Sequence, residues 1–119
     1  GEQMKVLIAF LTVSISESEQ HNPALGLIKA ILSRKFMSPE FYDLMEAMLK
    51  LNVRSQKSSL RQQSAGIFIR YLLDYPMSDE RFEQHLKQIV ANISYEYKEG
   101  RLSAMQMLTA VEERLPDEL

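Results

Sequence analysis

The sequence predicts an all-α protein built of antiparallel helical hairpins, arranged as HEAT-like repeats in an α–α superhelix. Six segments have helical character, and short polar or proline-containing corners separate them. The stretches "MSPEF" and "MSDERF" begin at Met37 and Met77, and prolines close helical segments at Pro76 and Pro116, so both features recur after 40 residues. A self-match of that length with two helices per unit is typical of stacked helical hairpins, although chance similarity between helix caps is the alternative explanation.

Length and composition favour one soluble helical domain over residues 1–119, or a piece of something longer. Hydrophobic residues make up 45% of the chain and charged residues 25%, which suffices for a core and a solvated surface. The chain lacks cysteine, which excludes disulfides and thiolate metal sites. The stretch at residues 4–15 has a lysine followed by an apolar run, as in a signal peptide. It has no small-residue cleavage site and is too short to span a bilayer, so no membrane association is expected.

The first three helices are predicted at residues 3–15, 23–35 and 39–51. The first is apolar nearly all round, and its valine and isoleucine content leaves a strand as the alternative. Asn22 and Ser38 are expected to cap the second and third helices, because each precedes a proline at the first helical position.

The last three helices are predicted at residues 58–75, 79–97 and 102–115. The fourth is apolar on two sides, which places it in the middle of the stack. The fifth carries an apolar stripe that extends to Tyr97, and the polar stretch around Gly100 is expected to end it.

The corner between the fourth and fifth helices is short. Pro76 steers the residue before it away from helical dihedrals, and Ser78 is a good N-cap for the next helix. A connection this short forces the two helices to pack antiparallel. Within the fourth helix, Gly66 is expected to permit a close helix approach.

No catalytic, cofactor-binding or metal-binding residues are predicted. His21 and His85 are far apart, and neither belongs to the i, i+4 histidine pair of a zinc-binding helix. His85 is expected on the polar, solvated side of its helix. The carboxylate side chains occur mainly at helix starts and near the end of the chain, and we interpret them as surface charges. An all-helical enzyme would need a pocket with converging polar groups.

A basic segment is the candidate binding site. No acidic residue lies between Glu46 and Asp74, and hydroxyl and amide side chains accompany the cations there. This combination suits contact with the phosphate backbone of RNA without base readout, while a solvated inter-helix loop is the alternative. No aromatic residue is interleaved with the cations, which argues against stacking of single strands. The candidate RNA-backbone contacts are Lys50, Arg54, Lys57 and Arg61.

Three stretches resemble a segment of the Down-regulated-in-metastasis family. These are "LLDYP" at residues 72–76, "YEYKEGR" at residues 95–101 and "SRKFMSPEF" at residues 33–41. The similarity covers roughly residues 33–110, and their order and spacing make it more specific than any one helix corner. Members of this family are very large helical-repeat proteins associated with the U-three small nucleolar ribonucleoprotein.

The resemblance implies a nucleolar, non-catalytic scaffold of the small-subunit processome. Residues 1–119 would then be a single helical-repeat domain and a fragment of a much longer α-solenoid. Its partners would be pre-ribosomal RNA and processome proteins, and it would act in early processing of the small-subunit RNA. A general HEAT-type protein–protein adaptor without RNA contact is the alternative.

The apolar stretch "VLIAFL" at residues 6–11 lacks the polar outer face of a capping repeat, so the isolated chain is expected to self-associate.

Overall fold

The computed structural model of the protein describes residues 2–17 and 22–115, and within them it contains six α-helices and no β-strand. The all-α prediction is therefore confirmed, and the strand alternative for the first segment is wrong. None of the described helices is long and apolar enough to cross a membrane. The helices are α1 (Glu2–Glu17), α2 (Asn22–Ser33), α3 (Pro39–Arg54), α4 (Ser58–Asp74), α5 (Asp79–Asn92) and α6 (Lys98–Arg114).

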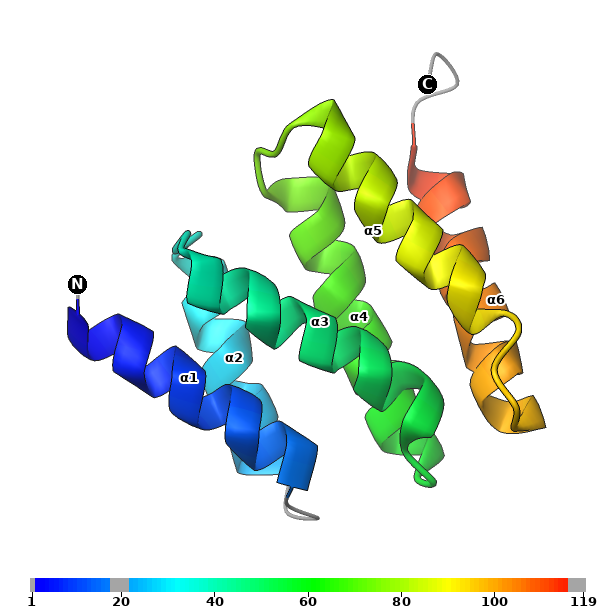
Figure 1. Cartoon of the computed structure of the whole chain (residues 1–119), viewed down its shortest axis with the longest axis horizontal. Helices are drawn as coiled ribbons and strands as arrows, with labels where there is room; N and C mark the ends of the chain where they lie inside the picture. Colours follow the sequence, from blue (N-terminus) through cyan, green and yellow to red (C-terminus); the bar gives the residue numbers. More distant parts are fainter. Residues whose placement is uncertain (1, 18–21, 116–119) are drawn as a thin grey trace.

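The helices form three antiparallel hairpins in two layers. In Figure 1, α1, α3 and α5 run in the same direction across the front, and α2, α4 and α6 return behind them. Helix α1 packs on α3, α2 packs on α4, and α6 packs against both α3 and α4. The molecule measures 38 × 33 × 18 Å. Its short dimension is about two helix diameters, as expected of a HEAT-like stack of hairpins.

The 40-residue period of the sequence is a period of the structure. Helices α3 and α5 begin at Pro39 and Asp79, and α4 and α6 begin at Ser58 and Lys98. The second and third hairpins therefore have the same layout, displaced by 40 residues. Pro116, which was expected to close the last helix, lies outside the described residues.

Serine caps start α3 and α5 as predicted. The Ser38 hydroxyl accepts a hydrogen bond from the Phe41 N–H at 3.2 Å, and the Ser78 hydroxyl accepts one from the Arg81 N–H at 3.1 Å. Each bond satisfies a donor at the helix start that has no partner within the helix, a contribution of about 1 kcal/mol. The two corners between hairpins are thus built in the same way.

The predicted boundary between the fifth and sixth helices is wrong. Helix α5 ends at Asn92 instead of residue 97, and α6 begins at Lys98 instead of residue 102. Gly100 lies in the first turn of α6, where an added Cβ would collide with the carbonyl oxygen of Val53 and lie 2.6 Å from the Tyr95 ring. The glycine is therefore required by the close approach of α6 to the end of α3, and it does not end a helix.

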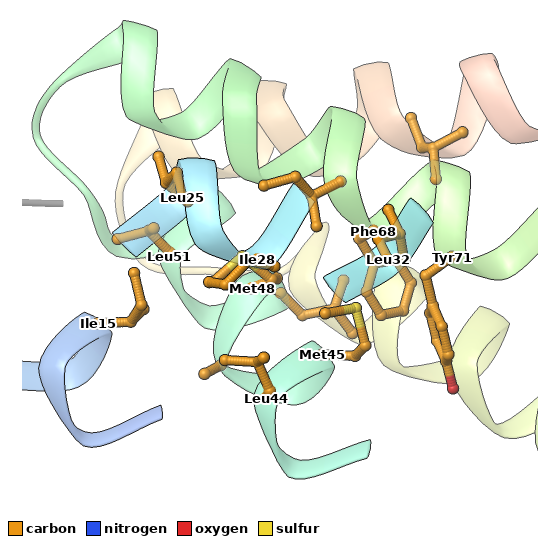
Figure 2. Packing of buried hydrophobic residues seen from close by; sticks show 14 of the residues in the cluster. Ile15, Leu25, Ile28, Leu32, Leu44, Met45, Met48, Leu51, Phe68 and Tyr71 are labelled. Carbon is orange, nitrogen blue, oxygen red and sulfur yellow. The ribbon is translucent and has the colours of Figure 1, made fainter. Parts of the chain in front are cut away.

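The core fills the space between the two layers. Figure 2 shows Leu25 and Ile28 of α2 beside Met48 of α3, and the Phe68 and Tyr71 rings of α4 further along. All five side chains are buried. Because α3 and α4 contribute much of this core, the central hairpin holds the outer two in place, which agrees with the predicted central position of the fourth helix.

Candidate nucleic-acid interface

The four predicted basic residues lie where α3 ends and α4 begins. Lys50 and Arg54 are one turn apart on α3, Lys57 is the N-cap of α4, and Arg61 is in the first turn of α4. We call Lys50, Arg54, Lys57 and Arg61 the basic corner. Figure 1 places this corner on the same edge of the molecule as the loop between α5 and α6.

Arg54 lies between two hollows in the surface. Together with Lys50 and Ile15 it lines a hollow of about 120 Å³ between α1 and α3. Together with Arg61 it lines a second hollow of about 420 Å³ between the basic corner and the α5–α6 loop. Lys57 lines neither of these two hollows. Three of the four cationic residues, Lys50, Arg54 and Arg61, therefore line these hollows, and Arg54 lines both.

The cationic groups of Lys50, Arg54 and Lys57 are available to an anion. All three residues are exposed. Within the described part of the chain, ion pairs form on α1, α4 and α5 and involve none of these three residues. Among the described residues, therefore, no carboxylate neutralises these three charges by direct contact.

Arg61 differs from the other three because it holds the corner together. Its Nη1 donates a hydrogen bond to the Ser55 carbonyl oxygen at 2.7 Å, and its Nε donates to Ser103 Oγ at 3.1 Å. The buried Asn52 amide donates to the Arg61 carbonyl oxygen at 3.0 Å. These bonds connect Arg61, at the start of α4, to the α3–α4 loop, to α3 and to α6. Arg61 therefore fixes the positions of the exposed cations.

The α5–α6 loop brings Tyr97 to the larger hollow, which the sequence interpretation missed. Tyr97 was expected at the end of a helical apolar stripe, whereas the residue lines the hollow and is 62% exposed. The loop is fixed by Arg101, whose Nη1 donates to the carbonyl oxygens of Tyr95 and Glu96, both at 2.9 Å. No local sequence signal pairs Tyr97 with Arg54, because the two lie in different hairpins.

His85 is buried instead of solvated, so the expectation for it is wrong. Only 1% of the residue is exposed, and its Nε2 lies 2.7 Å from the Tyr71 hydroxyl. Its Nδ1 lies 3.1 Å from Gln88 Oε1, and Gln88 Nε2 donates to Glu46 at 3.5 Å. Because Gln88 Oε1 can only accept, the ring carries its proton on Nδ1, and Nε2 accepts from Tyr71. Burial lowers the pKa of His85 and raises the pKa of Tyr71.

This polar junction joins α5 to α4 and is not a metal site. Among the described residues, no three potential metal ligands of the His, Cys, Asp and Glu types lie close enough to hold an ion. His21, the other histidine, lies outside the described residues. The junction is best explained as a buried structural contact whose donors and acceptors satisfy each other.

The stacked hairpins give the chain an all-α fold of the HEAT-like repeat class. No family model matches the chain. It is 28% identical over 113 residues to the U3 small nucleolar RNA-associated protein 20 of Schizosaccharomyces pombe, covering 95% of this chain. It is 27% identical over 97 residues to the protein of the same name from Saccharomyces cerevisiae, covering 82% of this chain. The chain spans about 4% of the length of each relative.

Proposed function

We propose that this chain is a non-catalytic segment of a large scaffold that acts in ribosome biogenesis, within the small-subunit processome of the nucleolus. Two relatives named for association with U3 small nucleolar RNA support this, as does similarity that covers most of this chain. The small share of each relative that is matched supports the view that the chain belongs to a longer solenoid. Its partners would be pre-ribosomal RNA and processome proteins.

The exposed basic corner is the observation that carries the RNA contact. Lys50, Arg54 and Lys57 present positive charge at one edge of the molecule, and Arg61 holds the loop between them in place. Lysine and arginine side chains bind phosphates without reading base sequence, and their binding releases counterions from the nucleic acid. The corner therefore suits the backbone of a folded RNA held against a scaffold.

Reversing two charges of the corner is expected to weaken RNA binding. In the Arg54→Glu/Lys57→Glu variant, affinity should fall at least about tenfold at low salt, and the slope of log K against log[salt] should flatten by about 1.4 for single-stranded RNA. Fluorescence anisotropy with labelled RNA between 50 and 200 mM salt, a range over which counterion release has a large effect, measures both quantities.

The matched control is the Lys29→Glu/Arg34→Glu variant. It changes the net charge by the same amount, at two exposed positions in and just beyond α2. Its salt slope should stay close to that of the unaltered chain. Equal slopes for the corner variant and the unaltered chain would remove the basic corner from the RNA contact.

A protein–protein adaptor without RNA contact is the second candidate, and an apolar face of α1 favours it. Val6, Phe10 and Val13 lie on one side of the helix and are 68%, 66% and 54% exposed. The opposite side of α1 packs into the core through residues such as Ile8 and Leu11. Isolation of the longer native protein with protein partners but without pre-ribosomal RNA would favour this candidate.

The same face leads us to propose that the isolated chain self-associates through α1. Within a solenoid a neighbouring hairpin covers such a face, and a second copy can cover it in solution. Sedimentation velocity should show a concentration-dependent oligomer that Phe10→Lys converts to a monomer. Val90→Lys, which alters a comparably exposed residue on α5, should leave the oligomer intact. A monomer at high concentration in the unaltered chain would contradict the proposal.

A further inference from the structure

The larger hollow at the basic corner has the size of a small-ligand site, and its lining is mostly polar. Its volume of about 420 Å³ lies within the range of about 300–1,000 Å³ found for such sites. Arg54 at the end of α3 and Gln56 of the α3–α4 loop form one wall, and Tyr97 of the α5–α6 loop and Glu99 in the first turn of α6 form the other. Helical-repeat stacking thus brings an aromatic ring, guanidinium groups, an amide and a carboxylate around one space.

The Tyr97 ring is presented to solvent by a loop whose geometry is fixed. Its edge-to-face contact with Tyr95 has a ring-centroid distance of 5.8 Å and an interplanar angle of 63°. Arg101 holds the backbone on the N-terminal side of Tyr97, and Gly100 lets α6 pack directly against the end of α3. The exposed ring is therefore held in place before any ligand arrives, which lowers the entropy cost of stacking on it.

Charge is distributed unevenly around the hollow. Arg54 is exposed and forms no ion pair among the described residues, whereas Glu99 places a carboxylate on the opposite wall, in the first turn of α6. A phosphate is attracted to the Arg54 side and repelled from the Glu99 side. The carboxylate, in turn, can accept hydrogen bonds from the N–H groups on the edge of a nucleobase.

We propose that this hollow binds one unpaired nucleotide of an RNA, with its base stacked on Tyr97 and its phosphate at Arg54. Proteins recognise single-stranded RNA by stacking unpaired bases on aromatic side chains and by contacting base edges, while cations follow the backbone. The inference rests on the proposed function and extends it, because a purely phosphate-binding corner would not distinguish paired from unpaired RNA. The lack of aromatic residues within the basic segment argued against stacking of single strands, but here another hairpin supplies the aromatic residue.

The test compares single-stranded RNA with a blunt RNA duplex of the same length, using fluorescence anisotropy and the full 119-residue chain. Tyr97→Ala should weaken single-strand binding about tenfold, because stacking of one base on an aromatic ring changes affinity by roughly five- to 150-fold. Tyr97→Phe keeps the ring face and should bind within about twofold of the unaltered chain. Duplex binding should change less than about twofold in both variants, because paired bases cannot stack on the ring.

Three outcomes would overturn the proposal. Unchanged single-strand affinity in Tyr97→Ala would do so, as would an equal loss for single strand and duplex. A loss of copurifying protein partners without any loss of RNA affinity would assign the hollow to a protein contact instead. The corner variant Arg54→Glu/Lys57→Glu separates this from the proposed function: weaker RNA binding there, with no effect of Tyr97→Ala, removes the nucleotide site and leaves the backbone contact standing.

Discussion

Replacing Tyr71 with alanine is expected to lower the free energy of unfolding by about 3–5 kcal/mol, the usual cost of truncating a buried aromatic residue. The Tyr71 side chain is fully buried where three helices meet. Its ring centroid lies 5.8 Å from that of Phe41 on α3, 5.6 Å from that of Phe68 on α4 and 5.2 Å from that of His85 on α5. Truncation removes contacts with all three helices at once. Urea denaturation followed by circular dichroism measures the loss.

The hydroxyl group of Tyr71 can be tested separately. Tyr71→Phe leaves His85 Nε2 buried without a donor and should cost about 1–3 kcal/mol. Tyr75→Phe is the matched control, because the Tyr75 hydroxyl is buried without a hydrogen-bond partner in the described part of the chain, and burial raises its pKa to about 12. Its removal should be neutral or stabilising. An equal cost for the two substitutions would show that the His85–Tyr71 hydrogen bond adds nothing specific.

The same junction predicts how stability changes with pH. Burial holds the pKa of His85 below its ordinary value, and the nearby Arg81 acts in the same direction, whereas Gln88 and Glu46 oppose the shift. The unfolded chain therefore binds a proton at this position more readily than the folded chain. The stabilising contribution is complete above the unfolded pKa of about 6.5 and is lost as pH falls through the lower pKa of the folded state. In His85→Gln this part of the pH dependence should vanish.

Adding a methyl group at Gly100 is expected to destabilise the protein by about 1–3 kcal/mol, the typical cost of overpacking. The new Cβ would collide with the Val53 carbonyl oxygen and lie 2.6 Å from the Tyr95 ring. The backbone oxygen cannot rotate away, so the α5–α6 loop must separate from the end of α3. Thermal unfolding should show a lower midpoint. Because this displacement also alters the larger hollow, single-strand RNA binding should weaken in the same variant.

Gly66→Ala is the matched control for Gly100→Ala. Gly66 also lies in a helix, but among the described residues a Cβ there would meet nothing within 4 Å. The expectation that Gly66 permits a close helix approach is therefore wrong. Alanine should stabilise the exposed helix position by about 0.5–1 kcal/mol through its higher helix propensity. If both substitutions changed stability in the same direction, the close approach at Gly100 would not be the cause.

Local signals were sufficient to predict most of the fold. Serine and proline at the starts of α3 and α5 specify caps through bonds that span only three residues, so sequence reasoning found both corners. The basic corner was also predictable, because its cations are close together in the chain. The α5–α6 boundary was not, since the requirement for glycine at position 100 comes from Val53, in another hairpin.

Burial of His85 and exposure of Tyr97 could not be read from their neighbours in the chain. His85 lies among polar residues in "EQHLKQ", a pattern of a solvated helix face, and its partner Tyr71 belongs to a different helix. Tyr97 continues an apolar spacing that extends beyond the point where α5 ends. In both cases the deciding contact joins elements whose relative position depends on the stacking of hairpins.

The loops that join the two helices within the second and third hairpins lie along one edge of the molecule (Figure 1). A longer array of the same 40-residue unit would repeat such loops at regular intervals on that side. A flexible polymer lying along that side would be bound by many individually weak contacts at once, and avidity would make the overall affinity high. Loss of one such contact would then free the polymer locally, while the remaining contacts would keep it bound.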